Sequence, residues 1–261
     1  MSATFSFIGT GNMGGALARA VCQAVGPENL LLYDLDGAKS GALARELGCR
    51  AVTLQEAAGA DCIFLGVKPH LVAPVLESLE PARHAVLVSM AAGVTLERLS
   101  QLAPGRGILR IMPNTPVGIG AGVVLWCANE LVSAPQQAAV TAALSPAGLV
   151  EQLEERLMDA ATAVSGCSPA FTDLYIEALA DGGVACGLPR DKALRLAAAA
   201  VAGTARLALE SGLHPGVLKD AVCSPGGSTI QGVRALENHG FRAAAMEAVI
   251  AAAESSTKLG K

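Results

Sequence analysis

Aromatic and charged residues are scarce in this sequence: they make up 3% and 16% of its 261 residues. The net charge is −4 and no basic stripe runs along the chain, so nucleic acid is a poor candidate partner. The 4 histidines and 7 cysteines show no metal-ligand spacing and no C-x-x-C pair, so we expect no metal site. An odd number of widely spaced cysteines is typical of free thiols in a reducing cytoplasm.

Signals for export or membrane insertion are also lacking. The first residues, MSATFSFIG, lack the basic region and long apolar run of a signal peptide. The long uncharged stretches 111–129 and 131–150 contain prolines, glycines and polar residues, so neither predicts a membrane span. We therefore expect a soluble, cytoplasmic protein without a membrane partner.

Small aliphatic residues are what the chain has in abundance. Hydrophobic residues make up 52% of it, and the mean hydropathy is +0.45. A core of alanine, valine and leucine needs closely approaching helices, and the surplus of apolar surface indicates burial against another subunit. The length predicts one large domain or two of ordinary size.

A glycine-rich turn stands near the N-terminus, in the segment FSFIGTGNMG at 5–14. An apolar run of strand type leads into it, and a helical pattern follows at once. Gly9 allows the tight turn, Gly11 lets the backbone approach a pyrophosphate, and Gly14 lets the helix lie close to the strand. Free N–H groups at the helix start then face the anion. A glycine turn without a cofactor is the alternative. The turn predicts a dinucleotide site made by Gly9, Thr10, Gly11, Asn12, Met13 and Gly14.

Asp34 lies 20 positions beyond Gly14 and ends the apolar run 30–33. The residue at the tip of the second strand of a dinucleotide fold meets the adenosine ribose. A carboxylate there accepts hydrogen bonds from the ribose hydroxyls and repels a 2′-phosphate, so Asp34 favours NADH over NADPH. Lys39 could partly offset that repulsion. A solvated acid in a turn is the alternative interpretation of Asp34.

Further apolar runs alternate with helices or short crossovers, which predicts a doubly wound, mostly parallel sheet. Loops after the carboxyl ends of such strands form the ligand crevice. We therefore expect Val67, Lys68, Pro69, Ala91 and Asn114 to face the cofactor. The expected strands are 51–52, 61–67, 85–89, 107–112, 120–126 and 148–152, with helices at 39–47 and 134–144.

The pattern changes near residue 154, beyond which no strand pattern is found. We expect a dinucleotide-binding domain at 1–155 and an all-α domain at 156–261. The helix from Arg190 is apolar on several faces, which is typical of a buried helix. In so small a domain that burial favours a partner subunit, so we expect a dimerisation domain. Burial within its own subunit is the alternative. The predicted helices are 155–164, 170–186, 190–211, 215–222, 229–238 and 242–259.

The segment SPGGST at 224–229 interrupts the helical domain. Its two adjacent glycines free the backbone to turn just before a helix, so several N–H groups point into the turn without backbone partners. Such a helix start suits a carboxylate, and Thr229 adds a hydroxyl. The alternative is a simple break between helices with Ser228 or Thr229 as N-cap. The predicted carboxylate ligands are Gly226, Gly227, Ser228 and Thr229.

Six segments, in chain order, closely resemble the pyrroline-5-carboxylate reductase family: FIGTGNMGGAL, GVKPH, MPNTP, AVSGCSPAF, EALADGGVACGLPR and VCSPGGSTIQGVRALENHGFR. The resemblance implies a Rossmann domain that binds NADH or NADPH, and a helical domain that forms a dimer, commonly assembled into decamers. The implied reaction is reduction of 1-pyrroline-5-carboxylate to L-proline, the last step of proline biosynthesis. It also implies that the Thr229 hydroxyl is the catalytic group, which hydrogen-bonds the ring nitrogen.

Two other functions remain as alternatives. A reductase of a six-membered cyclic imino acid would use the same carboxylate-binding loop. A non-catalytic dinucleotide-binding regulator would not need that loop intact. The N-terminal motif also resembles β-hydroxyacid dehydrogenases, but these use a lysine on the first helix of the second domain, and no lysine follows Ser165 until Lys192. Cys167 and Ser168 stand where the reductase family often carries Ser-Gly.

Overall fold

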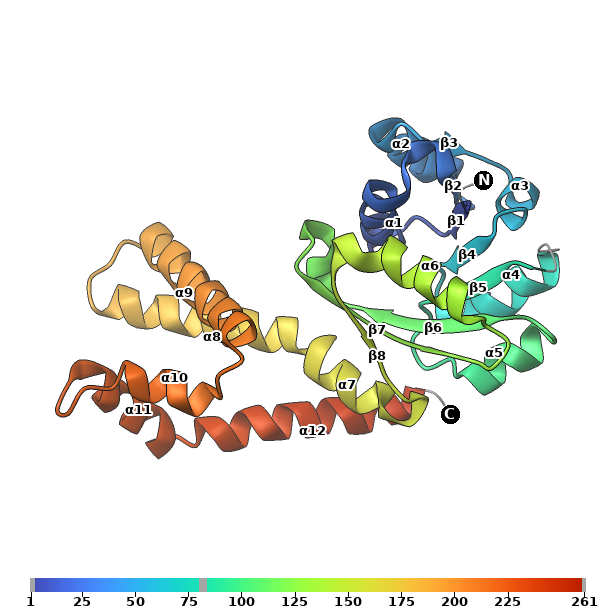
Figure 1. Cartoon of the computed structure of the whole chain (residues 1–261). Helices are drawn as coiled ribbons and strands as arrows, with labels where there is room; N and C mark the ends of the chain where they lie inside the picture. The colour runs from blue at the N-terminus through green and yellow to red at the C-terminus, as the bar shows by residue number, and fades with distance from the viewer. Residues whose placement is uncertain (1–2, 80–83, 260–261) are drawn as a thin grey trace. The chain divides into compact units, whose positions relative to one another are not determined.

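The computed structural model describes residues 3–79 and 84–259, with side chains up to Ser256. The chain divides into two compact units, which we call the sheet unit (residues 1–167 and 252–261) and the helical unit (residues 168–251). Figure 1 shows the elements of both. The predicted boundary between residues 155 and 156 divides a dinucleotide-binding domain from a dimerisation domain, and this division of function stays a prediction.

The sheet unit contains one eight-stranded sheet in the order β3-β2-β1-β4-β5-β6-β7-β8. Every neighbouring pair is parallel except β6 and β7, which are antiparallel. The prediction of a doubly wound, mostly parallel sheet is therefore confirmed. The strands are β1 (Phe5–Ile8), β2 (Leu30–Tyr33), β3 (Arg50–Ala51), β4 (Cys62–Leu65), β5 (Val86–Ser89), β6 (Ile108–Pro113), β7 (Gly122–Ala128) and β8 (Gly148–Gln152).

Helices cover both faces of the sheet (Figure 1). One apolar cluster joins the Phe5 and Phe7 side of β1 to α1 (Asn12–Val25), α2 (Gly37–Leu47) and α6 (Ala134–Leu144). A second cluster joins the Ile8 side to α3 (Leu54–Ala58), α4 (Val72–Ser78) and α5 (Leu96–Leu102). Alternate residues of a strand face opposite sides, so strands buried on both faces are continuously apolar.

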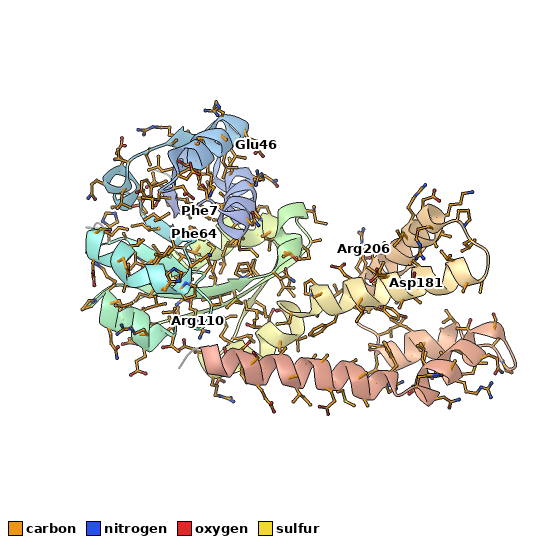
Figure 2. The ribbon with its side chains drawn as sticks, turned by 180° about the vertical axis from the view of Figure 1, so that it is seen from behind. Phe7, Glu46, Phe64, Arg110, Asp181 and Arg206 are labelled. Carbon is orange, nitrogen blue, oxygen red and sulfur yellow. The ribbon has the colours of Figure 1, made fainter. Side chains whose placement is uncertain are left out.

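The first cluster is centred on two stacked aromatic rings, Phe7 of β1 and Phe64 of β4 (Figure 2). Their centroids are 4.4 Å apart and their planes differ by 6°. Both residues are fully buried. Because β1 and β4 are central neighbours, this stack fixes the strand on which the glycine turn is built.

Two predicted elements differ from the structure. The strand expected at 120–126 is β7 at 122–128, because η3 (Thr115–Ile119) precedes it and Gly120 ends that 3-10 helix with a φ of 71°. The helix expected at 155–164 is divided into η5 (Glu155–Leu157) and α7 (Met158–Ser165). The remaining 3-10 helices of the sheet unit are η1 (Pro27–Asn29), η2 (Pro69–Leu71) and η4 (Ser145–Ala147).

The helical unit buries little of its own surface. Only Ala180, Ala193 and Ala197 form its buried cluster, where α8 packs against α9. Small side chains permit that approach: a Cβ on Gly183 would lie 3.3 Å from the Cβ of Ala193. No strand is found at 154–259, as predicted. The helices are α8 (Ser168–Ala185), α9 (Arg190–Ser211), α10 (Pro215–Ala221), α11 (Ser228–Asn238) and α12 (Phe241–Leu259), the last running on into residues of the sheet unit.

Large apolar side chains of the helical unit are instead exposed, so α9 is not buried within its own chain in the way the alternative interpretation required. Leu196, Leu207 and Leu209 of α9 expose 60%, 53% and 79% of their surface. Such a surface on a small helical unit marks an interface. The other exposed apolar residues of this unit are Leu174, Leu179, Leu188, Leu194, Leu213, Val217, Val222, Leu236, Phe241, Met246 and Ile250.

Candidate functional site

The glycine turn joins β1 to α1 with very little space around it. Gly9 has a φ of +95°, and a Cβ on it would lie 2.6 Å from the carbonyl oxygen of Gly66. A Cβ on Gly14 would overlap the carbonyl oxygen of Gly9. Gly11 differs, because nothing lies within 4 Å of the position its Cβ would take. Two of the glycines therefore serve the fold, and Gly11 leaves open space on the side where a phosphate would lie.

The start of α1 is free for an anion. Gly11 is the N-cap, and no side chain of the described residues caps it. The first turn carries no acidic residue that would compete for its N–H groups. An uncapped helix start with its positive dipole end is a ready site for phosphate.

Asp34 holds this turn in place from the end of β2. Its Oδ2 accepts hydrogen bonds from the Thr10 backbone N–H at 2.7 Å and the Thr10 hydroxyl at 3.1 Å. Its Oδ1 accepts one from the Asp36 N–H at 3.0 Å. Burial alone would raise the pKa of Asp34, but these hydrogen bonds outweigh it and hold the pKa below its ordinary value. The group is thus an ionised carboxylate at neutral pH, and Oδ1 keeps room for a further donor.

A cleft of about 610 Å³ opens beside the turn. Five of the predicted cofactor residues line it: Gly9, Gly11, Asp34, Val67 and Lys68. The sequence analysis missed its apolar wall, which includes Leu35, 93% exposed, and Leu54 and Leu71. The signal available for Leu35 was an apolar residue in the polar turn after Asp34. An apolar wall opposite a carboxylate suits an adenosine, whose base is flat and whose ribose carries donors.

The other predicted cofactor residues lie around the cleft or behind it. Thr10 and Asn12 line a neighbouring cavity of about 410 Å³ together with Gly11 and Lys39. Met13 packs against the core, Gly14 and Ala91 are buried, and Pro69 is exposed in η2. Their place in the site therefore stays a prediction.

Asn114 follows β6, which ends at Pro113, and its side chain is hydrogen-bonded inside the protein. Its Nδ2 donates to the Ser165 carbonyl oxygen at 2.8 Å, and its Oδ1 accepts from the Val123 N–H at 2.8 Å. The residue is 8% exposed. A buried amide with both ends satisfied is a structural connector in this geometry. Its predicted contact with the cofactor stays a prediction.

The loop before α11 is the second anion site predicted from the sequence. Gly226 has a φ of +68°, and Gly227 is the N-cap of α11, with no side chain among the described residues capping it. Ser228 and Thr229 are the first residues of the helix rather than its cap, which differs from the alternative interpretation. Both are exposed. The helix start is therefore uncapped and open, with the Thr229 hydroxyl beside it, as a carboxylate site requires.

The described residues contain no group of three or more His, Cys, Asp or Glu side chains that could hold a metal ion. Among them, no single helix has the length and apolarity to cross a membrane. Only α9 and α10 together reach that threshold, and they are bent by 119° at the break between them.

Comparison with known proteins covers the whole chain. A family model described as pyrroline-5-carboxylate reductase dimerisation matches residues 155–259, and one described as NADP oxidoreductase, coenzyme F420-dependent, matches residues 4–93. The pyrroline-5-carboxylate reductase of a Synechocystis species is 44% identical over 266 residues, covering 100% of both chains. That of Escherichia coli is 42% identical over 268 residues, with the same coverage.

Solved structures agree. The crystal structure of a Plasmodium falciparum pyrroline carboxylate reductase with NADP bound matches with a TM-score of 0.87 at 32% identity, covering 99% of this chain and 98% of that one. Both the sequence and the fold are thus shared over full length. This chain belongs to the pyrroline-5-carboxylate reductase family.

Proposed function

We propose that this chain reduces 1-pyrroline-5-carboxylate to L-proline with two separate anion sites, the turn at 9–14 for the dinucleotide and the loop at 226–229 for the substrate carboxylate. The observation that carries the proposal is the uncapped start of α11, which offers N–H groups and a hydroxyl but no competing carboxylate. The dinucleotide supplies a hydride when bound.

The reaction requires mainly that the hydride donor and the imine carbon be aligned. A protonated cyclic imine is already electrophilic: the hydride adds to the imine carbon, the C=N electron pair moves to nitrogen, and the product is a secondary amine. The residues at 226–229 hold the carboxylate, and the Thr229 hydroxyl accepts a hydrogen bond from the protonated ring nitrogen. No strong acid or metal is needed for that step.

The ring size is tested by assaying five- and six-membered cyclic imino acids side by side with the full chain. We expect a higher kcat/KM for pyrroline-5-carboxylate. A higher value for the six-membered ring would favour the alternative reductase, and dinucleotide binding without turnover of either would favour a regulator.

We propose NADH as the preferred cofactor, because the ionised Asp34 would repel a 2′-phosphate. Asp34→Asn is expected to move the ratio of kcat/KM values toward NADPH by at least about 10-fold, since a repulsion of roughly 1.4 kcal/mol corresponds to that factor. The measurement is the steady-state rate with each cofactor. Asp36→Asn is the matched control, because Asp36 caps α2 and asparagine caps as well. An equal NADH preference in both variants would assign the preference elsewhere.

We propose that the helical unit forms a dimer that assembles further into a decamer, in the reducing cytoplasm. The family model for dimerisation supports self-association. A groove of about 620 Å³, lined mainly by apolar residues such as Leu174, Tyr175 and Phe241, supports burial of this unit. All 7 cysteines are free thiols, as a reducing compartment would keep them. Sedimentation equilibrium on the full chain is expected to give a decamer; a monomer would contradict both stages of assembly.

We also propose that the division of roles falls between residues 155 and 156, with dinucleotide binding before it and subunit association after it. The NADP oxidoreductase model ends at residue 93, well before this point, and the dimerisation model begins at residue 155.

A further inference from the structure

Two side chains of strand β6 and the residue after it contact helix α7 and the 3-10 turn before it. Arg110 and Met112 occupy alternate positions of this strand, which ends at Pro113, and Asn114 follows it with extended backbone, so the three side chains are expected on the same side. Each of the three reaches a different part of the segment 155–165. The strand that leads into the MPNTP segment therefore also holds the last helix of the sheet unit.

The first of these contacts is the ion pair of a buried arginine. Arg110, labelled in Figure 2, is 3% exposed. Its Nη1 donates to Glu155 Oε1 at 3.0 Å, and its Nη2 lies 3.6 Å from Asp159 Oδ1. Glu155 Oε1 also accepts from the Leu96 N–H at 2.7 Å. A charge so deeply buried needs such partners, so the start of α7 has a defined place on β6.

The middle of α7 is held by apolar packing and its end by a hydrogen bond. Met112 packs in an apolar cluster with Met158, which is fully buried, and Ala161 of α7. At the far end, Asn114 Nδ2 donates to the Ser165 carbonyl oxygen at 2.8 Å. That carbonyl belongs to the last turn of the helix and has no continuing helical partner of its own there. The Asn114 amide thus donates the hydrogen bond that a further turn of the helix would otherwise have supplied.

The covalent chain continues directly from this point. The N–H groups of Gly166 and Cys167 both bind the Thr162 carbonyl oxygen, at 2.7 and 3.0 Å. Ser168, the next residue, begins α8 and the helical unit. Ser165 therefore lies three residues before the first residue of the helical unit.

We propose that Asn114 is a positioning residue for the hydride transfer: through the Ser165 carbonyl oxygen it holds the end of α7, three residues before the helical unit begins. The proposal rests on the proposed function, in which the cofactor is held by the sheet unit and the substrate carboxylate by the helical unit. A misplacement of reacting groups by about 1 Å can cost roughly 100-fold in rate, so a local shift at the end of α7 is expected to be visible in kcat.

Asn129 provides a matched control at the opposite end of the same strand pair. Its Oδ1 accepts from the Ile108 N–H at 3.0 Å and its Nδ2 donates to the Arg106 carbonyl oxygen at 2.9 Å. It makes the same two kinds of hydrogen bond as Asn114 but touches nothing on α7. Asn114→Ala and Asn129→Ala are expected to lower the Tm by similar amounts. Only the first is expected to lower kcat, by about 10- to 100-fold. The Kd for NADH is measured beside it, because Asn114 is also a predicted cofactor contact, and a rise in Kd with no change in kcat would assign the residue to cofactor binding instead.

Asn114→Asp separates the two hydrogen bonds of Asn114. An ionised aspartate still accepts from Val123 but cannot donate to Ser165, whereas a protonated one can do both. The kcat of Asn114→Asp relative to wild type is therefore expected to recover as the pH is lowered toward the pKa of the new carboxyl group. A flat ratio, or equal kcat values in Asn114→Ala and Asn129→Ala, would overturn the positioning role.

Hydrogen exchange gives a readout that needs no turnover. In Asn114→Ala, the amides of Gly166 and Cys167 are expected to exchange faster than in wild type, and in Asn129→Ala they are expected to be unchanged. Unchanged exchange in both variants would refute the connection itself. An inactive wild-type protein with faster exchange in Asn114→Ala would instead refute the proposed function and leave the connection standing.

Discussion

Replacing Thr229 with alanine is expected to lower kcat/KM for pyrroline-5-carboxylate by about 10- to 150-fold. The lost hydrogen bond involves a charged ring nitrogen and is worth about 1.5–3 kcal/mol in the transition state. Thr229 is exposed at the uncapped start of α11, so the fold has no evident need for its hydroxyl. The measurement is the steady-state oxidation of NADH over a range of substrate concentrations.

Thr229→Ser is the matched control, because serine keeps the hydroxyl and loses only a methyl group. It is expected to retain most of the wild-type rate. A wild-type rate in purified Thr229→Ala would remove the proposed catalytic role, and an equal loss in both variants would assign the effect to packing rather than to the hydroxyl.

Replacing Gly14 with alanine is expected to weaken NADH binding by at least about 100-fold and to lower the Tm as well. The new Cβ would overlap the Gly9 carbonyl oxygen, which is backbone and cannot turn aside. The start of α1 must then move away from the turn, and each lost hydrogen bond to a phosphate costs about 1.5–3 kcal/mol. Titration of nicotinamide fluorescence measures the Kd, and thermal unfolding measures the Tm.

Two further glycines make this prediction specific. Gly11→Ala is expected to weaken NADH binding without lowering the Tm, because its Cβ meets nothing within 4 Å in the protein itself. Gly41→Ala on α2, whose Cβ would lie 3.7 Å from Arg45 Nη1, is expected to change neither. Unchanged NADH binding in Gly11→Ala would show that the pyrophosphate does not lie over this turn.

The sheet could be predicted because its strands are short, apolar on both faces and separated by clear turns. Phe5–Ile8 and Cys62–Leu65 have no polar face that would suit an antiparallel sheet open to water. The antiparallel direction of β7 relative to β6 could not be predicted from its composition, because the direction depends on the turn that η3 and Gly120 form. The contacts of the segment 155–165 could not be predicted either, because its partners Arg110 and Asn114 are distant in the sequence.

The site was predictable where local backbone geometry decides the chemistry. The glycine turn and the loop before α11 both depend on residues within a few positions of one another. The contact of Asp34 with the adenosine ribose stays a prediction, and the structure adds that the same carboxylate accepts hydrogen bonds from Thr10 in the turn. Leu35 follows Asp34 directly, whereas Leu71 of η2 and Val75 of α4 line the cleft only because the fold brings these elements to it. The helical unit buries only a small alanine cluster and leaves large apolar side chains exposed, and the family model for dimerisation supports their burial by self-association.

The central claim is that a hydride passes from the bound nicotinamide to the imine carbon of pyrroline-5-carboxylate. The most direct measurement supplies the full-length protein with that imine and with NADH carrying deuterium as the transferred hydride, and determines the product by mass spectrometry. We expect L-proline with one deuterium on the former imine carbon. Proline without deuterium, or NADH left unoxidised while both ligands are bound, would contradict the account.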